Sequence, residues 1–552
     1  MNWTSFFHID SLNGFVAIAV LGFSLIVILY SIRFMKGKPN LFRYYLWTVL
    51  AAIGSVGVCF ANNLIVLLGL WGFLGLALYI LINTGGEGAN EVAKKTFVIV
   101  GGTDALMLLG IAIIYFLSGT STMTAINLQM NSGLTITAYL CVAVACFAKA
   151  GLMPFHSWIP ECAQKAPLPV VAFLPASLDK LLGIYLLARL SLNLFVMNEA
   201  MNILLMVMGA FTIIVAVMMA LAQHDMKKLL GFHAVSQVGY MVLGIGTGNP
   251  IGIAGGIFHM LNHAIYKSCL FFTSGNVEHR LKTTELDELG GLAKLMPITY
   301  ICTIIASLSI SGIPPFNGFV SKWMIYQGIV TDLRVHSMAL KVTSVICLFA
   351  AMFGSSLTLA SFMKLIHATY LGQEAKSNAG VRTREVSWQM WLPCVILAVL
   401  CAVLGVFAIQ LPLKYFILPA IGCPAVFIGT WQAVLATGLV VIALILGLLA
   451  MRLSLIKPKV RQGATFIGGE ELDLVTYRMT GTEFYKTITD LSALKRFYKA
   501  IEGGALDIYE QGKDLVFFLA KPLHKLHNGV LSSYLVWCLL GIMAMLLWGI
   551  VK

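Results

Sequence analysis

Four lysines stand where lysine is seldom kept, inside or beside long apolar stretches: Lys149, Lys180, Lys267 and Lys322. A lysine at the centre of a membrane-spanning helix costs roughly 2.5 to 3.5 kcal/mol on insertion scales, so such a residue is usually retained for function. Removal from water weakens proton binding by an amine, and a nearby carboxylate strengthens it. The four lysines are therefore candidates for proton-binding groups whose affinity changes with their surroundings.

Two histidines extend this set. His259, His263 and Lys267 recur every four residues and share one stripe of a helix. Histidine titrates near neutrality, so such a stripe can relay protons. The HxxxH spacing is also typical of zinc sites, but no third ligand lies nearby in the sequence, and no metal is expected. His233, one helix earlier, is either part of the relay or a packing histidine.

Two carboxylates, Asp104 and Asp179, also lie within apolar stretches of the sequence. Asp104 lies beside two glycines near the start of an apolar stretch, so it is either a proton-binding group or a helix cap. Asp179 precedes Lys180 but points about 100° away on a helix, so the two need not pair.

Lys149 closes its stretch, and the alternative to a buried role is a lysine whose head reaches back to water.

The elements that position these residues are membrane-spanning helices. The chain is 59% hydrophobic and 11% charged over 552 residues, with a mean hydropathy of +0.88. A bilayer core roughly 30 Å thick requires about twenty apolar residues per helix, and the sequence contains about fourteen such stretches, with the interrupted stretch 296–330 counted once. The predicted fold is an all-α polytopic membrane protein.

The apolar stretches form two similar sets of five, over residues 42–190 and 201–366. In each set the fourth helix is interrupted by proline, at LMPFHSWIP and at SGIPPFNGF, with an offset of 160 residues. An odd number of spans inverts the second copy in the membrane. Matched broken helices in inverted repeats are typical of a transport site. The alternative is that each proline only kinks a packed helix.

The rest of the chain flanks these repeats. Residues 1–41 hold an N-terminal span, 388–451 hold additional spans, and 530–552 hold a final span. Between them, 452–529 alternates charged and aromatic residues at helical spacing. This pattern predicts an amphipathic lateral helix at the cytoplasmic interface that binds lipid or a neighbouring subunit.

The net charge of +13 does not indicate nucleic-acid binding, because the basic residues lie beside helix ends. They gather in loops of one parity, which predicts that these loops face the cytoplasm and that both termini face outside. The expected location is a prokaryotic inner membrane. The loops contain Arg33, Lys36, Lys38, Arg43, Lys227, Lys228, Arg280, Lys282, Arg382, Arg384, Arg452, Lys457, Lys459 and Arg461. Eleven scattered cysteines without a CxxC pair predict no redox centre or cofactor in this chain.

Three long motifs in order resemble the antiporter-like subunits of respiratory complex I, Mrp-type cation/proton antiporters and membrane-bound nickel-iron hydrogenases. The resemblance covers about residues 6–410. The motifs are KAGLMPFHSWIPECAQKAPLPVVAFLPASLDKLLGIYLLAR, AQHDMKKLLGFHAVSQVGYMVLGIGTGNPIGIAGGIFHMLNHAIYKSCLFFTSG and SLSISGIPPFNGFVSK. FIGGE at 466–470 and PASLDKLLGIY favour the hydrogenase or formate hydrogenlyase-linked branch.

The resemblance implies a role for each residue. Lys149 is the central lysine of a first half-channel and Lys180 a connecting lysine. His259, His263 and Lys267 belong to the second half-channel, and Lys322 is the terminal group. Asp179, His233 and Asp225, the last in the Q-x-D-x-K stretch, are candidates for supporting roles. Where the family has W-E, this chain has Trp71 and Gly72, so the glutamate partner of Lys149 is missing and Asp104 is the nearest substitute.

The resemblance also implies function and partners. The main hypothesis is a proton-translocating subunit of a redox-driven complex, in which peripheral iron–sulfur or hydrogenase subunits handle the electrons. The alternatives are a subunit of an Mrp-type Na+(K+)/H+ antiporter, with Na+ as a further candidate ion, and a non-pumping partner as in inorganic-carbon uptake. In relatives two earlier spans precede the segment that begins this chain, which predicts that a small partner subunit covers that surface.

Overall fold

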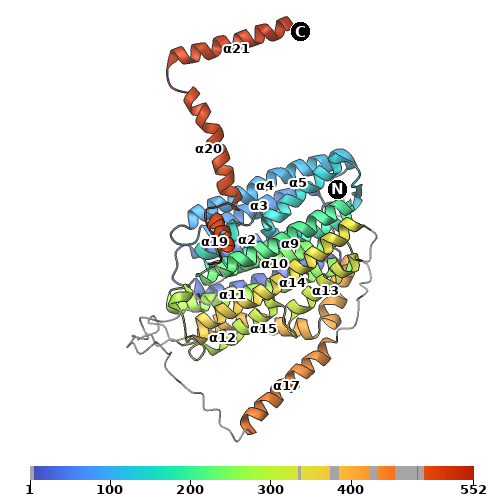
Figure 1. Cartoon of the computed structure of the whole chain (residues 1–552), viewed down its shortest axis with the longest axis vertical. Coiled ribbons are helices and arrows are strands. Elements are labelled where there is room, and N and C mark those ends of the chain that lie inside the picture. The colour runs from blue at the N-terminus through green and yellow to red at the C-terminus, as the bar shows by residue number, and fades with distance from the viewer. Residues whose placement is uncertain are drawn as a thin grey trace. The chain divides into compact units, whose positions relative to one another are not determined.

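The computed structural model describes residues 5–333, 337–372, 384–422, 432–453 and 490–551, together with residues 427 and 482. These residues are almost entirely helical, and long helices lie side by side (Figure 1). The helices through the first repeat are α1 (Ser11–Phe34), α2 (Leu41–Phe60), α3 (Leu64–Ile82), α4 (Ala89–Ser118), η2 (Met123–Ala125), α5 (Gly133–Ala150), α6 (Trp158–Lys165), α7 (Leu168–Phe173), η3 (Leu174–Leu178), α8 (Asp179–Arg189) and η4 (Leu190–Leu194). Two short parallel strands, β1 (Leu128–Gln129) and β2 (Phe195–Val196), join its loops.

The second repeat and the described segments after it also consist of helices. The helices are α9 (Glu199–Leu221), α10 (Met226–Gly246), α11 (Pro250–Leu281), η5 (Leu286–Glu288), α12 (Pro297–Ser311), α13 (Asn317–Asp332), α14 (Met338–Ile366), η6 (His367–Leu371), α15 (Trp388–Val406), η8 (Ile409–Ile417), α16 (Leu418–Ile421), α17 (Ala433–Leu453), α19 (Ser492–Glu502), α20 (Ile508–Leu526) and α21 (Leu531–Val551).

Eleven helices among the described residues are long and apolar enough to cross a membrane, against the fourteen stretches expected. Three differences account for the gap. The polar residues of α11 lower its hydropathy, the stretch 296–330 is divided into the short helices α12 and α13, and the described apolar part of α17 is short. The all-α polytopic architecture predicted from the sequence is confirmed, and the exact number of spans stays a prediction.

Several helix starts carry a capping side chain, because the first backbone N–H groups of a helix lack partners within it. Asp10 accepts hydrogen bonds from the N–H groups of Leu12 and Asn13 at the start of α1. The same arrangement recurs at later helices, with the capping residues Asn63, Ser132, Asn198, Asp225, Asn249 and Ser337.

The helices that carry the candidate residues form the interior of the bundle. The helix over Leu168–Leu194 and α10 are buried along their spans. Glycines let these helices approach closely: a Cβ at Gly239 would lie 2.6 Å from the carbonyl oxygen of Gly209 on α9. Small residues at helix contacts are typical of membrane bundles, where packing rather than water drives association.

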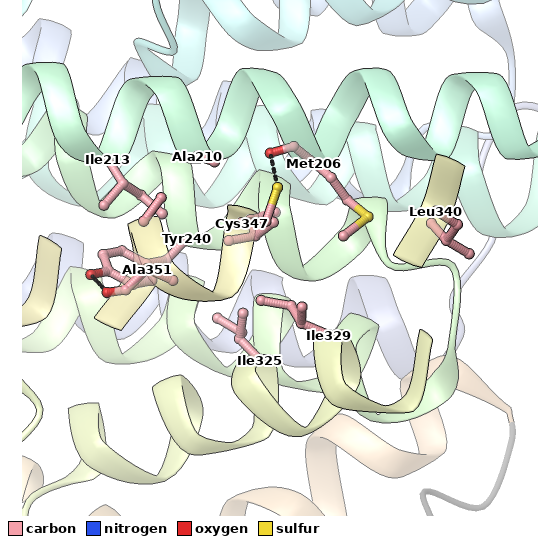
Figure 2. Packing of buried hydrophobic residues seen from close by; sticks show 11 residues of the cluster. Met206, Ala210, Ile213, Tyr240, Ile325, Ile329, Leu340, Cys347 and Ala351 are labelled. Atoms are coloured by element: carbon pink, nitrogen blue, oxygen red, sulfur yellow. Dashed lines mark hydrogen bonds between the residues drawn. The ribbon is translucent and has the colours of Figure 1, made fainter. Parts of the chain in front are cut away.

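A buried cluster joins α9, α10, α13 and α14 (Figure 2). Two contacts to backbone oxygens fix α14 in it: Cys347 Sγ lies 3.6 Å from Met206 O, and the Tyr240 hydroxyl donates a 2.6 Å hydrogen bond to Ala351 O. The cluster consists of Met206, Ala210, Ile213, Tyr240, Leu243, Ile325, Ile329, Leu340, Cys347, Ala350 and Ala351. The cluster therefore holds the Tyr240 side chain against α14.

Residues 496–552 form a separate compact unit. Its helix α20 exposes Phe517, Phe518 and Leu519 and also carries Lys513 and Lys521, which agrees with the amphipathic pattern expected there. Other parts of the predicted lateral segment, with FIGGE, Lys457, Lys459 and Arg461, lie outside the described residues, as does Arg382.

Candidate functional site

The two proline-containing interruptions have the same local geometry. In each, a glycine with φ of +81° and ψ of 41° follows the helix end, Gly151 after α5 and Gly312 after α12. A cis peptide bond follows each glycine, at Met153–Pro154 and at Pro314–Pro315. A helix that ends in the membrane interior leaves carbonyl oxygens without helical partners. Both breaks therefore place backbone acceptors inside the bundle.

A buried lysine donates to the carbonyl end at each break. Lys180 Nζ donates a hydrogen bond to Ala150 O, at the end of α5. Lys322 Nζ donates to Ile310 O at 2.9 Å, near the end of α12, and to Ser355 Oγ at 3.1 Å. The repeats thus use the same device, an ammonium group at the negative end of a half-helix.

Lys149, in the last turn of α5, is fully buried, so its head does not reach water. Its Nζ lies 4.5 Å from the centre of the Trp71 ring and has no hydrogen-bond partner among the described residues. Asp104 interacts with it electrostatically. The interpretation of Asp104 as a helix cap is wrong, because it lies in the middle of α4, whose cap is Gly88.

The position of the missing glutamate is open. A Cβ built at Gly72 would meet no atom within 4 Å. Asp104 adjoins the same helix one turn later, since its Oδ2 lies 3.7 Å from a Cβ built at Gly75. A carboxylate therefore does lie next to α3, but it comes from α4.

The first residue of α8 is Asp179, which is 1% exposed. It follows the π-helical turn η3, where Pro175 interrupts the normal hydrogen-bond pattern and the Ser177 hydroxyl donates to the carbonyls of Ala172 and Phe173. Such turns are frequent at functional sites because they re-aim the side chains that follow. Asp179 Oδ2 has no hydrogen-bond partner within the described chain.

The stripe of His259, His263 and Lys267 that the sequence predicted lies on α11 and is fully buried. His259 Nδ1 lies 2.9 Å from Ser321 Oγ and its Nε2 3.1 Å from Gln237 Oε1, so this ring joins α11 to α10 and α13. The Nζ of Lys267 lacks a hydrogen-bond partner within the described part of the chain, and the His263 ring lies beside the backbone of Ala176. A buried polar atom such as this Nζ requires a partner, which water or a moving side chain can supply.

Electrostatic contacts link the two repeats through the middle of the bundle. Lys180 interacts with His263 and with Lys267, across the boundary between α8 and α11. Lys322 in turn interacts with His259. The site residues therefore form one row, which runs Asp104, Lys149, Asp179, Lys180, His263 with Lys267, His259 and Lys322.

His233 and Asp225 take different positions. His233 Nε2 lies 2.7 Å from Ser361 Oγ, and its ring interacts with Lys267 and Lys322, so it stands beside the row. Asp225 caps α10 by accepting from Lys228 N, and it also accepts from the Thr284 hydroxyl. Because it caps a helix end, Asp225 lies away from the row. Its capping of α10 gives it a structural role.

Sequence reasoning missed three polar groups. Lys364 is buried in α14 and donates to Leu221 O and Gln223 O, which closes the end of α9. Tyr240 holds its ring 4.5 Å from Lys322 Nζ. Asp332, 3% exposed, ends α13 and accepts from Asn249 Nδ2 at 2.9 Å. Lys364 had the same signal as the other lysines, a charge inside an apolar stretch.

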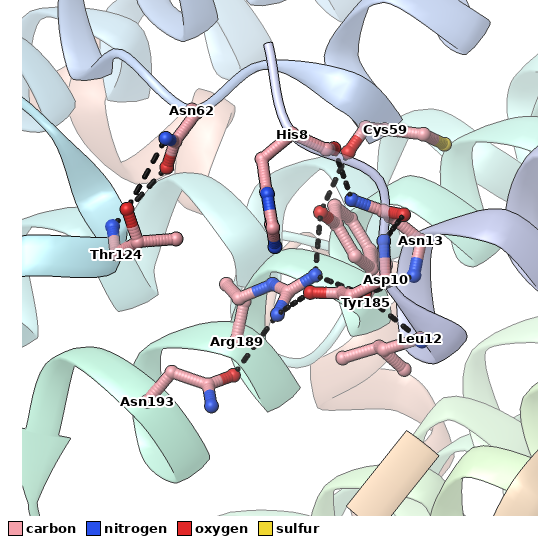
Figure 3. A network of polar contacts seen from close by, with 10 residues as sticks. All are labelled: His8, Asp10, Leu12, Asn13, Cys59, Asn62, Thr124, Tyr185, Arg189 and Asn193. Carbon is pink, nitrogen blue, oxygen red and sulfur yellow. Dashed lines mark hydrogen bonds and ion pairs between the residues drawn. The ribbon is translucent and has the colours of Figure 1, made fainter. Parts of the chain in front are cut away.

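A cavity of about 200 Å³ lies at the end of α8, between the N-terminal segment and the loops of the first repeat. Arg189 crosses it to Asp10, with 2.7 Å between Arg189 Nη1 and Asp10 Oδ2, and it also contacts Tyr185 and Asn193 (Figure 3). The Tyr185 hydroxyl donates to Cys59 O at 2.8 Å. The lining is polar, so the cavity is suited to hold water.

The row consists of groups that bind and release protons, spaced from one helix to the next inside the bundle. Among the described residues its only carboxylates are in the first repeat, at Asp104 and Asp179. A proton-transfer series fits these groups better than nucleophilic or metal chemistry.

The NADH:quinone oxidoreductase/Mrp antiporter transmembrane family model matches residues 61–354, just over half of the chain. The chain belongs to this family. The matched region contains every residue of the row. The protein is therefore a multi-pass membrane protein of antiporter-like type, as its motifs predicted.

Curated relatives include subunits of Na(+)/H(+) antiporters. One from Alkalihalophilus pseudofirmus is 31% identical over 428 residues, which are 74% of this chain and 53% of the relative. Another, from Staphylococcus haemolyticus, is 31% identical over 423 residues, or 72% of this chain and 52% of the relative. The chain thus spans about half the length of the curated relatives it matches. These relatives favour the Mrp-type alternative over the hydrogenase-linked branch.

Two solved structures share the fold. A chain of the membrane-bound sulfane sulfur reductase, an archaeal respiratory membrane complex, aligns with a TM-score of 0.78 at 23% identity, over 98% of this chain and 89% of that one. A chain of the Mrp complex from Dietzia sp. DQ12-45-1b aligns with a TM-score of 0.68 at 22% identity, over 75% and 84%. Both neighbours are parts of multi-subunit membrane complexes.

Proposed function

We propose that this protein is a proton-translocating subunit of a multi-subunit cation/proton antiporter of Mrp type. The observation that carries the proposal is the row of buried lysines and histidines that crosses from α5 to α13. Each member lies on a helix inside the bundle, and the row includes a lysine beside each break. The curated relatives, which are Na(+)/H(+) antiporter subunits, support the choice of antiporter.

The charge of the row favours protons as its ion. It contains four lysines and three histidines with two carboxylates, counting His233 beside it. A site for Na+ needs several oxygen ligands with negative charge, by analogy with other hard cations. A row rich in amines repels Na+ but accepts a proton on each neutral amine or imidazole. We therefore place any Na+ path elsewhere in the complex.

A second candidate is a subunit of a redox-driven complex, in which other subunits handle the electrons. The observation that favours it is the extent of the shared fold, which covers 98% of this chain in the sulfane sulfur reductase neighbour. Peripheral iron–sulfur or hydrogenase partners would belong to this candidate. The inner-membrane location and the outward-facing termini are predictions common to both candidates.

Transport in vesicles tests the proposal. The full complex is expressed with Lys267→Ala or Lys322→Ala, and the proton gradient coupled to Na+ or K+ is recorded in inverted vesicles. Both variants are expected to lose coupled transport, while the wild-type complex responds to Na+ or K+ without an electron donor. Full transport in both variants would favour a non-pumping role. A gradient that requires a reduced donor would favour the redox-driven candidate, as would copurified iron–sulfur subunits.

A further inference from the structure

Two oppositely charged side chains of the first repeat are buried, and each has an atom without a hydrogen-bond partner in the described chain. Lys149 Nζ on α5 is 0% exposed, and Asp179, whose Oδ2 is unpartnered, is 1% exposed. An unpaired charge in a protein interior is disfavoured by several kcal/mol. Two such charges of opposite sign on adjacent helices are stabilised by facing each other.

The packing of α5 against α8 brings these residues to one level. A Cβ at Gly183 would lie 2.9 Å from Ala150 N and 3.0 Å from Cys146 O, so this face of α8 touches the last turns of α5. Asp179 is four residues before Gly183 and shares its face. Lys149 lies in the touched segment.

Neighbouring contacts agree with this register. Lys180, next to Asp179, donates to Ala150 O, one residue after Lys149. Asp179 interacts electrostatically with both Lys149 and Lys180. The packing register therefore places Asp179 at the level of the last turn of α5.

We propose that Asp179 is the carboxylate partner of Lys149, in the role that the family assigns to a glutamate at the position of Gly72. The proposal rests on the proposed function. It moves the partner from α3 to α8, on the opposite side of the break, and gives Lys149 a carboxylate that is next in sequence to the connecting Lys180.

The relocation changes what the carboxylate can do. A glutamate at Gly72 would lie on α3, whereas Asp179 is the sequence neighbour of Lys180 and interacts with both lysines. An ionised Asp179 near Lys149 favours a proton on that amine, and rotation toward Lys180 releases it. The same carboxylate then couples the first half of the row to the second. Asp104, which is less buried than Asp179, also interacts with Lys149.

Transport by charge-neutral and charge-conserving variants tests this assignment. In the assembled complex, Asp179→Asn is expected to lower coupled proton transport by about tenfold or more, because one partner charge changes proton affinity by one to three powers of ten. Asp179→Glu is expected to keep most of the rate. Asp104→Asn is the matched control and is expected to lower it less. A large loss in Asp104→Asn with none in Asp179→Asn would overturn the assignment.

A rescue variant uses the open space on α3. Because a Cβ at Gly72 meets no atom within 4 Å, the backbone there admits the start of a glutamate side chain. The double variant Gly72→Glu with Asp179→Asn is expected to regain part of the transport lost in Asp179→Asn. A double variant no better than the single one would show that Asp179 does more than supply the charge, against the proposal.

Thermal unfolding of the purified complex separates this assignment from the proposed function. Lys149→Met and Asp179→Asn each leave a buried charge unpaired and are expected to lower the Tm, whereas the double variant is expected to melt above both. Additive losses would refute the pairing. If Lys149→Ala and Lys267→Ala leave transport intact while the double variant recovers in Tm, the proposed function fails and the pair stands.

Discussion

Lys322 Nζ donates a 2.9 Å hydrogen bond to the carbonyl oxygen of Ile310, two residues before the glycine that ends α12. Lys180 makes the corresponding bond to Ala150 O in the first repeat. Each break therefore has a buried lysine at its helix end, contributed by α8 in the first repeat and by α13 in the second. A lysine that loses its proton also weakens its hold on the helix end, which couples protonation to the geometry of the break.

Replacement of Lys322 should affect transport and stability together. In Lys322→Met the Ile310 carbonyl loses its ammonium donor, and the unmade hydrogen bond is expected to cost about 1 to 3 kcal/mol. Coupled proton transport is expected to disappear. Thermal unfolding and vesicle transport measure the two effects.

Lys364→Met is the matched control for this variant. Lys364 is also a buried lysine that donates to helix-end carbonyls, Leu221 O and Gln223 O, but it lies outside the row. A similar loss of stability with retained transport is expected. Equal loss of transport in both variants would mean that helix-end capping, not protonation, accounts for the effect of Lys322.

His259 connects three helices, and its replacement should interrupt the row. In His259→Leu the contacts to Ser321 and Gln237 disappear, and the row keeps only His233 beside it between Lys267 and Lys322. Transport is expected to fall by about a hundredfold or more, the lower end of the range for loss of a positioned proton-transfer group. Tyr266→Phe removes only a hydroxyl 3.3 Å from His259 Nε2 and should keep the rate. Equal rates for His259→Leu and wild type would remove this residue from the path.

Because Asp10 forms an ion pair with Arg189, we expect the free energy of unfolding to change in acid. Burial raises the pKa of Asp10, but the bond and charge of Arg189 and the N–H groups at the start of α1 lower the pKa more, to below its ordinary value of 3.8. A lowered pKa stabilises the fold above 3.8, and this contribution is lost as the pH falls through the folded value. Asp10→Asn should therefore lower the Tm at neutral pH and bring the two proteins closer together in acid. A difference in Tm that does not shrink below pH 3.8 would contradict this.

The sequence predicted those parts of the site that have a local signal. A lysine in an apolar stretch, a histidine at helical spacing and a proline near a glycine each stand out without knowledge of the fold. Lys149, Lys180, Lys267 and Lys322 were found this way, and so were the breaks after Gly151 and Gly312. Their order along the row follows from packing of α8 against α11, which no local pattern encodes.

The direction in which a side chain points was harder to predict. Asp179 and Lys180 are neighbours in sequence, but Lys180 donates to Ala150 O, whereas Asp179 Oδ2 has no hydrogen-bond partner within the described chain. Asp104 resembled a helix cap because two glycines precede it, but α4 begins fifteen residues earlier, at Ala89. In both cases the tertiary contact, not the local composition, determines the role.

The contact between α5 and α8 at Gly183 gives the last prediction. In Gly183→Ala the new Cβ would meet Ala150 N at 2.9 Å and Cys146 O at 3.0 Å, and backbone atoms cannot move aside as a flexible side chain can. Overpacking of this kind costs about 1 to 3 kcal/mol, and it separates Asp179 from Lys149. The Tm and the coupled transport rate should both fall. Gly22→Ala, the same substitution in α1 where a Cβ meets nothing within 4 Å, should keep transport and leave the Tm unchanged or raised. Equal Tm and transport in the two variants would show that the close approach of α8 to α5 does not hold the lysine and carboxylate together.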